Sequence, residues 1–432
     1  CICQDRTRWM ADSRTSRLLR SLGPWLLVAA TGVGAGDLAT GAFTGSKLGV
    51  AILWAVVLGA FLKYLVNEGL ARYQLVTDAT LLEGAVQTFG RPLNYAFAVY
   101  LLLWSLFVGS ALMSACGATA HAILPVFKPA DGKIVFGLLH SGVAVVLVLR
   151  GGYALFEKVM SVCIAVMFAT VVLTAVTLGG DPAAILQGLF VPTIPQVDGV
   201  GLQWTIALMG GVGGTLTILC YGYWIREENR RGSQAICGSR VDLACGYIMT
   251  AFFGMAMVVI GSRVPLSGST GAALIVDIGE TLQTELGRLG PVARWMFLIG
   301  AWGAVFSSLL GVLQSVPYLF ADFWQLAQQD RKDFRPQPVD TSAWPYRGYL
   351  LGLAIVPAVG LWVKFEQVQK VYAIFGALFV PLVAVVLLVL NGPFGKLPVE
   401  YRNRWLTNLL LVATVLLFAW FGFYEVRGKF LS

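Results

Sequence analysis

The chain has 432 residues, of which 57% are hydrophobic and only 12% are charged, about half the charged share of soluble proteins. So few charges could not cover a soluble surface, whereas helices in lipid satisfy their own backbone groups and need no such cover. The net charge of +8 lies mostly in short connections between apolar runs, with no basic stripe interleaved with aromatic residues. We therefore predict an all-α integral membrane protein embedded in the lipid bilayer, without a nucleic-acid partner.

The N-terminal segment, residues 1–22, is basic and precedes the first apolar run. Residues 1–9 stand before Met10-Ala11-Asp12-Ser13, which reads like an ordinary start, so we interpret 1–9 as an extension that is not native. No apolar region followed by a small-residue cleavage site is present, so no signal peptide is predicted. We expect this segment in the cytoplasm.

Apolar runs long enough to be membrane helices recur along the rest of the chain, and we predict about eleven of them. In chain order they cover residues 23–49, 50–73, 93–123, 134–149, 156–178, 202–225, 243–260, 292–320, 348–363, 371–390 and 406–423. The odd number places the two ends of the chain on opposite sides of the membrane.

The distribution of basic residues indicates the orientation. With the N-terminus inside, the inner loops collect roughly twice as many Lys and Arg as the outer loops, most clearly in 226–240 and 331–347. Segment 180–201 has no Lys or Arg and contains three prolines, which favours an irregular outer loop, and 272–286 is expected to form an outer surface helix. We expect a bacterial plasma membrane, with the C-terminus outside.

Two glycine-interrupted segments lie five spans apart. The first is Gly32-Val33-Gly34-Ala35-Gly36-Asp37, and the second is Gly211-Val212-Gly213-Gly214-Thr215-Leu216. Paired interruptions of this kind indicate an inverted-repeat transporter, and an odd period makes the second repeat enter from the opposite side. We therefore divide the chain into a first repeat (23–179, helices 1–5), an outer loop (180–201), a second repeat (202–391, helices 6–10), and helix 11 with the C-terminus (404–432).

The glycine runs predict unwound backbone in the middle of helices 1 and 6. Each Gly costs about 1 kcal/mol of helix stability relative to Ala. Unwinding in lipid is tolerated where the freed N–H and C=O groups face a cavity and hold an ion or substrate. The geometry suits a secondary transporter that works by alternating access, not an enzyme, and no cofactor is predicted.

Asp37 follows the first break and has two interpretations. As a carboxylate near mid-membrane it is a candidate cation ligand or proton carrier, which ionisable residues in membrane helices usually are. Alternatively, it caps the second half-helix by accepting hydrogen bonds from the Ala39 or Thr40 N–H. The two roles are compatible, and the functional one is favoured.

Hydroxyl groups accompany the second break. Gly214 offers a backbone carbonyl, and Thr215 and Thr217 offer side-chain oxygens, at a position where an ion ligand is expected. The alternative for each Thr is a hydrogen bond to its own helix backbone. The alternative for the glycines is close helix packing.

Further polar residues are candidates for an ion pathway. Glu68 lies near the inner end of the second span, where it either serves an exit path or pairs with Arg72 one helical turn on, and the structural pairing is slightly favoured. Ser307, Ser308 and Gln314 recur at helical spacing in the eighth span, and they either face a cavity or bond to a neighbouring helix.

Several motifs resemble those of the Nramp family of divalent metal transporters, in its divergent branches. The similar stretches are Gly23-Pro24 with Asp37-Leu38-Ala39-Thr40, Leu75-Val76-Thr77-Asp78 with Leu81-Leu82-Glu83-Gly84, Tyr153-Ala154-Leu155-Phe156-Glu157-Lys158, and Phe379-Val380-Pro381-Leu382. The resemblance covers residues 23 to about 423. It implies the LeuT-type fold, a substrate site between helices 1 and 6, and an inorganic cation as substrate.

The chain departs from the family at the motif that binds the metal. The family signature Asp-Pro-Gly-Asn corresponds to Gly34-Ala35-Gly36-Asp37 here, so Gly34 replaces the metal-binding Asp and Asp37 takes the Asn position. The stretch Gly214–Thr217 has neither the Met nor the His of typical members. A carboxylate, hydroxyls, carbonyls and water suit magnesium or another hard cation better than manganese. The missing His leaves proton coupling open.

Other functions remain as alternatives. A LeuT-fold transporter of a non-metal substrate needs fewer ionised ligands, and the second break contributes none. A receptor that does not transport predicts a soluble output domain, which the sequence does not show. A membrane enzyme predicts a cluster of His, Asp, Glu or Cys within the membrane, which is also missing. The sequence makes no prediction about oligomeric state.

Overall fold

A computed structural model of the protein describes residues 36–196, 200–264, 272–328 and 339–430. These residues are almost entirely helical and contain no β-strand. Within them, seven helices are long and apolar enough to cross a membrane: Asp37–Thr77, Arg91–Ile123, Pro129–Arg150, Val200–Glu227, Ser233–Arg263, Gly287–Gln328 and Phe365–Leu390. Ala165–Leu178 and Trp405–Phe421 are shorter apolar helices. The predicted all-α membrane architecture is confirmed.

The described residues begin at the end of the first glycine run. A π-helical turn η1 (Gly36–Thr40) continues into α3 (Gly41–Leu48), the short 3-10 turn η2 (Gly49–Ile52) and the long helix α4 (Leu53–Thr77). Gly49 ends α3 with φ of +67°, a conformation that glycine adopts without steric cost. The predicted site residues Gly34 and Ala35 lie outside the described residues.

Helix α3 packs closely against α11 (Ile236–Arg263) through small residues. A Cβ atom on Gly45 would lie 2.1 Å from the Val258 carbonyl oxygen, and one on Gly261 would lie 2.1 Å from the Ala42 carbonyl oxygen. Only glycine allows the two backbones to approach this far. The contact fixes the half-helix that follows Asp37.

Beyond α4 the chain turns into the short helix α5 (Leu81–Phe89) and then α6 (Arg91–Ile123). Asp78 ends α4 in the left-handed conformation. A capping box starts α5: the Glu83 N–H donates to Thr80 Oγ1 at 3.1 Å, and the Thr80 N–H donates to Glu83 Oε2 at 2.5 Å.

The predicted fourth and fifth spans form one continuous helix, α7 (Pro129–Leu178), instead of two. Its 50 residues extend about 75 Å, more than twice the thickness of the hydrocarbon core. Gly151 and Gly152 lie between the two predicted spans. A penalty of about 1 kcal/mol for each is small enough for helical geometry to persist.

The segment 180–201 was predicted to be an irregular loop. Part of that prediction is wrong, because the segment contains helix α8 (Pro182–Phe190). Pro182 occupies the first helical turn, where its fixed φ favours a helix and its missing N–H costs nothing. The Asp181 carboxylate accepts a hydrogen bond from the Ala183 N–H at 3.0 Å. Of the three prolines taken as signs of irregular structure, Pro182 instead begins a helix.

The helix predicted at 202–225 is interrupted, as expected. Its parts are α9 (Val200–Gly211), a non-helical stretch at residues 212–215, the 3-10 turn η3 (Leu216–Leu219) and α10 (Cys220–Glu227). The remaining elements, besides three short 3-10 turns at 233–235, 287–289 and 399–401, are α12 (Ala272–Glu285), α13 (Gly290–Gln328), α14 (Trp344–Ile355), η6 (Val356–Trp362), α15 (Phe365–Ala377), α16 (Phe379–Leu390) and α17 (Trp405–Phe430). Helix α12 confirms the helix expected at 272–286.

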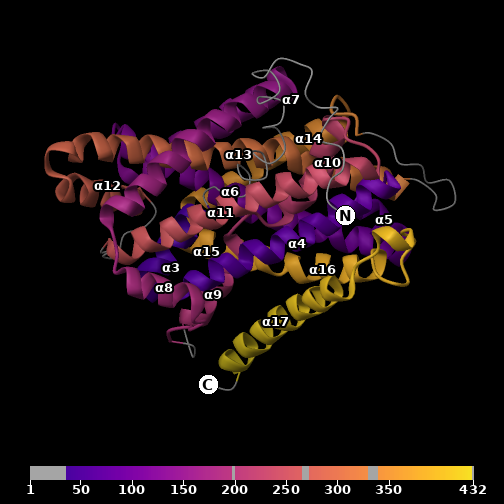
Figure 1. Ribbon diagram of the computed structural model, residues 1–432. Helices are drawn as coiled ribbons and strands as arrows, with labels where there is room; N and C mark the ends of the chain where they lie inside the picture. The colour runs from indigo at the N-terminus through magenta and orange to yellow at the C-terminus, as the bar shows by residue number, and fades with distance from the viewer. Residues whose placement is uncertain (1–35, 197–199, 265–271, 329–338, 431–432) are drawn as a thin grey trace, which may run out of the picture.

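The bundle has two distinct ends, and α4 runs between them (Figure 1). Helices α3, α8 and α9 gather at one end of α4, and α5 and α10 lie toward the other. Trp104, Trp204 and Trp224 are fully buried in the interior. By contrast, large apolar side chains such as Val99 and Phe252 are more than half exposed, which a lipid-facing surface accommodates.

Candidate functional site

The break between α9 and η3 is dictated by two consecutive glycines. Gly213 and Gly214 have φ of +77° and +81°, in the left-handed region that costs a residue with a Cβ atom about 1–2 kcal/mol. The ring of Tyr247 covers Gly213, whose Cβ would lie 3.0 Å from the Tyr247 ring. Backbone carbonyls in this stretch therefore leave the helical hydrogen-bond pattern and become free to bind other groups.

Lys63 of α4 occupies the break. Its side chain is 1% exposed, and its Nζ donates hydrogen bonds to the carbonyl oxygens of Gly210, at 2.7 Å, Val212 and Gly214. An ammonium group has three N–H donors and no acceptor, so these three carbonyls match its donors. The name "carbonyl cage" is used below for the oxygens of Gly210, Val212 and Gly214.

Asp37 lies in η1 and is fully buried. Its carboxylate interacts electrostatically with the Lys63 ammonium and with Tyr372 of α15. Gly254 of α11 lies behind it, where a Cβ would come within 3.9 Å of Asp37 Oδ1 and 3.5 Å of a Val212 methyl carbon. Asp37, which follows the first predicted break, thus lies beside the second break, and the charged group between them comes from α4.

The structure brings the predicted hydroxyls to the same region. Thr215 is fully buried, and its Oγ1 accepts a hydrogen bond from the Trp104 indole N–H at 2.8 Å and is also hydrogen-bonded to Tyr372. Thr217 is buried in η3. The Gly214 carbonyl, predicted as an ion ligand, accepts from Lys63.

The predicted pathway residues are divided between ion pairs and helix contacts. Glu68 pairs with Arg72 at 3.2 Å, the structural pairing favoured from the sequence, and also with Arg240 at 2.8 Å. The Ser307 hydroxyl donates to its own helix backbone, at the Ala304 carbonyl. The Gln314 side chain accepts a hydrogen bond from the Trp224 indole, and Ser308 is buried in the same helix. None of these contacts tests a role in ion movement.

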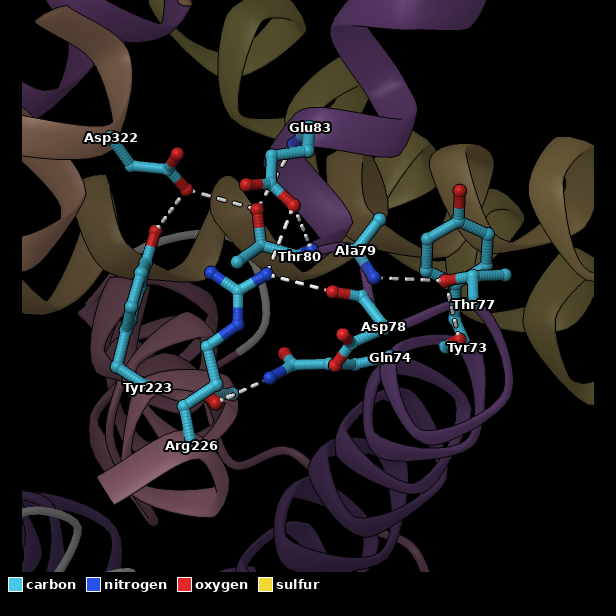
Figure 2. A network of polar contacts seen from close by, with 11 residues as sticks. Tyr73, Gln74, Thr77, Asp78, Ala79, Thr80, Glu83, Tyr223, Arg226 and Asp322 are labelled. Carbon is cyan, nitrogen blue, oxygen red and sulfur yellow. Dashed lines mark hydrogen bonds and ion pairs between the residues drawn. The ribbon is translucent and has the colours of Figure 1, made fainter. Parts of the chain in front are cut away.

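A polar network joins four helices at the end of the bundle that contains α5 (Figure 2). Arg226 of α10 pairs with Glu83 at 3.1 Å and donates to the Asp78 carbonyl at 2.9 Å. Asp322 of α13 accepts from the Thr80 hydroxyl at 2.9 Å and from the Tyr223 hydroxyl at 2.6 Å. These contacts link α4, α5, α10 and α13, so the network ties the second half of the interrupted helix to its neighbours.

Glu83 makes this network sensitive to pH. Its side chain lies in α5, outside the spanning helices, where burial and then the Asp322 carboxylate raise the pKa of Glu83 from 4.5 to about 7, against the opposing effect of Arg226. Between pH 4.5 and about pH 7, Glu83 in the folded protein therefore binds more protons than it does in the unfolded chain. The resulting stability is fully present below about pH 4.5 and is lost as the pH rises through about 7.

We expect the Glu83→Gln variant to lose part of the pH dependence of unfolding. The midpoint of the wild-type protein should fall more steeply than that of the variant between about pH 5 and pH 8, because only the wild type must release the proton from Glu83. Thermal unfolding in detergent across this range measures the difference. Glu400→Gln, at an exposed position, is the control, and parallel curves for wild type and Glu83→Gln would contradict the prediction.

Sequence reasoning missed Lys63 and most of the network. The signal for Lys63 was present, because a single Lys within an apolar run is an ionisable group inside the membrane and merits a functional hypothesis. Its partners were not readable, since Lys63 and Gly210 are 147 positions apart. Asp322, just beyond the eighth predicted span, is 1% exposed and accepts two hydrogen bonds.

The chain is similar to known membrane transport proteins. The chain matches the family described as natural resistance-associated macrophage protein-like (Nramp) over residues 25–426. The divalent metal cation transporter MntH of Pectobacterium carotovorum is 23% identical over 315 residues, which cover 70% of this chain and 73% of the relative.

Solved structures show the same fold. A mutant of the Eremococcus coleocola manganese transporter superposes with a TM-score of 0.69 at 16% identity, covering 97% of this chain and 88% of the other. MhsT in complex with L-phenylalanine gives a TM-score of 0.61 at 18% identity, with coverages of 91% and 98%. The chain therefore has the LeuT-type fold. The chain belongs to the Nramp family of divalent metal transporters.

Proposed function

We propose that this protein moves a hard divalent cation, with magnesium favoured over manganese, across the membrane by alternating access. The observation that carries the proposal is the fully buried Asp37 carboxylate beside the break of the second repeat. A buried carboxylate inside a membrane protein is expensive and is kept where it binds a cation or a proton. According to the resemblance described above, typical members of the family have a Met and a His in the stretch that corresponds to Gly214–Thr217, and this chain has neither.

The proposed ligands are oxygen atoms. Asp37 supplies the charge as the metal ligand, the backbone at Gly34, Ala35 and Gly36 and the Thr217 hydroxyl are further candidates, and water completes the shell. Carboxylate, hydroxyl, carbonyl and water oxygens are the ligands of magnesium and calcium, and transition metals gain no preference without a thioether or imidazole. The described residues contain no group of three or more His, Cys, Asp or Glu suited to a metal, which favours a weakly held, hydrated cation.

We also propose the orientation from the distribution of basic residues. The loop after α10 is rich in Arg, so the end of the bundle with the Glu83–Arg226 network would face the cytoplasm of a bacterial cell. The N-terminus would then be cytoplasmic and the C-terminus outside. In this orientation the network closes the inner side of the bundle, and opening it would release the cation. Neither the proposed ion preference nor the proposed orientation depends on proton coupling.

A second candidate is transport of a non-metal substrate. The Lys63 ammonium beside Asp37 is already a positive charge, so it lowers the attraction of the site for a second cation. This observation favours a non-metal substrate. A neutral or zwitterionic molecule would not be repelled in this way. The MhsT structure, which has the same fold, contains L-phenylalanine.

Uptake into proteoliposomes tests the proposal. We expect saturable uptake of magnesium by the wild-type protein, with manganese failing to outcompete it strongly, because the candidate ligands are all hard oxygen donors. Magnesium, manganese and calcium are compared in vesicles of the same composition, with empty vesicles as the control.

Two results would count against the proposal. Tight uptake of manganese that resists excess magnesium would contradict the ion preference. No uptake of any divalent cation by monodisperse protein would favour the non-metal substrate.

A further inference from the structure

Lys63 is the charged group that the proposed transport mechanism does not use. It reaches from α4 into the break of a different repeat, and its ammonium binds three backbone carbonyls. Rings of backbone carbonyls are how proteins replace the hydration shell of a monovalent cation such as potassium. The arrangement therefore has the chemistry of a cation site whose cation is covalently attached.

The carbonyl cage is positioned by the backbone and its packing, independently of Lys63. Gly213 and Gly214 set the direction of the chain through their positive φ values. On the other side, a Cβ on Gly210 would lie 2.5 Å from the Ala377 methyl and 2.6 Å from the Ala373 carbonyl oxygen, so α15 holds the end of α9 tightly. The cage is thus expected to persist when the lysine side chain is shortened.

Charge also requires a cation at this position. The Asp37 carboxylate is fully buried and interacts with the Lys63 ammonium, and the three carbonyl dipoles direct their negative ends to the same place. Removing the ammonium takes away a positive charge that interacts with this buried carboxylate, which destabilises the fold unless another cation replaces it. A small ion or a small amine would restore the positive charge.

We propose that Lys63 is a tethered cation that fills a monovalent-cation site formed by the carbonyl cage and Asp37. Without the side chain, this site binds a free small cation of the ammonium or alkali-metal class. In the arrangement observed, the three carbonyls are bonded to Lys63 and are not ligands for a transported metal. The inference does not depend on which divalent cation the protein transports.

The test is cation-dependent stability of the full-length Lys63→Ala variant in detergent, with a chelator present to remove divalent metals. Unfolding midpoints are measured in chloride salts of ammonium, methylammonium, potassium, sodium and lithium, and in choline chloride of the same ionic strength. We expect a lower midpoint than wild type in choline, and a saturable increase with at least one small cation, because binding to the folded state raises its stability. The wild-type midpoint should be the same in all salts.

The matched control is Lys133→Ala. Lys133 also donates to a backbone carbonyl, that of Val363 at 2.9 Å, but it does so at the surface and with a single acceptor. Its removal should produce no difference between choline and the small cations. A cation effect that appears equally in this variant or in the wild type would overturn the inference.

Two further measurements cover a variant that is not stable in choline. Lys63→Ala is then extracted and purified in methylammonium chloride, and recovery of a monodisperse protein supports the tethered cation, whereas failure with every small cation contradicts it. Lys63→Gln keeps N–H donors without the charge. If it is as stable as wild type and equally insensitive to salts, hydrogen bonding alone suffices and the inference is wrong. Loss of divalent-cation uptake would leave these outcomes unchanged, so the two proposals fail separately.

Discussion

Replacing Asp37 by Asn is expected to lower divalent-cation uptake at least about a hundredfold, because the charge of the ligands tunes the affinity of hard-cation sites over several orders of magnitude. Asn keeps the size of the side chain and one oxygen ligand but removes the negative charge. Initial rates in proteoliposomes, corrected for the amount of inserted protein, measure the effect. Glu366→Gln is the control carboxylate, since Glu366 pairs with Lys47 at the surface of the bundle and should not affect uptake.

The Asp37→Asn variant also leaves the Lys63 ammonium without its negative partner, which destabilises a buried pair. The double variant Asp37→Asn with Lys63→Met separates the two effects, because replacing both members of a buried ion pair by neutral groups is often neutral for stability. We expect the double variant to regain part of the unfolding midpoint, because the carbonyl cage has lost its donors, but not the uptake. Normal uptake in a well-folded Asp37→Asn protein would remove Asp37 from the proposed site.

Replacing Gly45 by Ala is expected to destabilise the fold by about 1–3 kcal/mol, the usual cost of an overpacked core. The new Cβ would meet the Val258 carbonyl oxygen at 2.1 Å, and two further backbone atoms of Val258 lie within 3.0 Å. Backbone atoms of a packed helix cannot move aside as a flexible side chain can. Helix α3 must therefore shift away from α11, and the turn that holds Asp37 shifts with it.

The matched control is Gly352→Ala in α14, where a Cβ would have no neighbouring atom within 4 Å. There the substitution should leave stability unchanged or increase it by up to about 1 kcal/mol, through helix propensity alone. Unfolding midpoints and the monodisperse fraction after extraction measure both variants. Equal midpoints for Gly45→Ala and Gly352→Ala would show that the contact between α3 and α11 is not rigid.

The sequence by itself determined the membrane class, the helical architecture and the position of the second break. The apolar composition indicates that the protein lies in lipid. In lipid, helices satisfy the hydrogen bonds of the backbone N–H and C=O groups. Glycine runs weaken helices locally, so the interruption at Gly213 and Gly214 could be located without knowledge of the fold. The same reasoning failed where helix formation was only slightly unfavourable, as in the continuous α7 and in α8.

Only the tertiary structure decided which groups meet at the breaks. Asp37 was predicted as a ligand, but its neighbour Lys63 was not considered, because the carbonyls that bind Lys63 are on another helix. Thr80 and Asp322 are similarly joined across 242 positions. Periodicity reports which face of a helix is apolar, whereas contacts between helices depend on how the whole bundle packs. Buried polar groups must find their partners in that packing, and sequence alone does not contain its geometry.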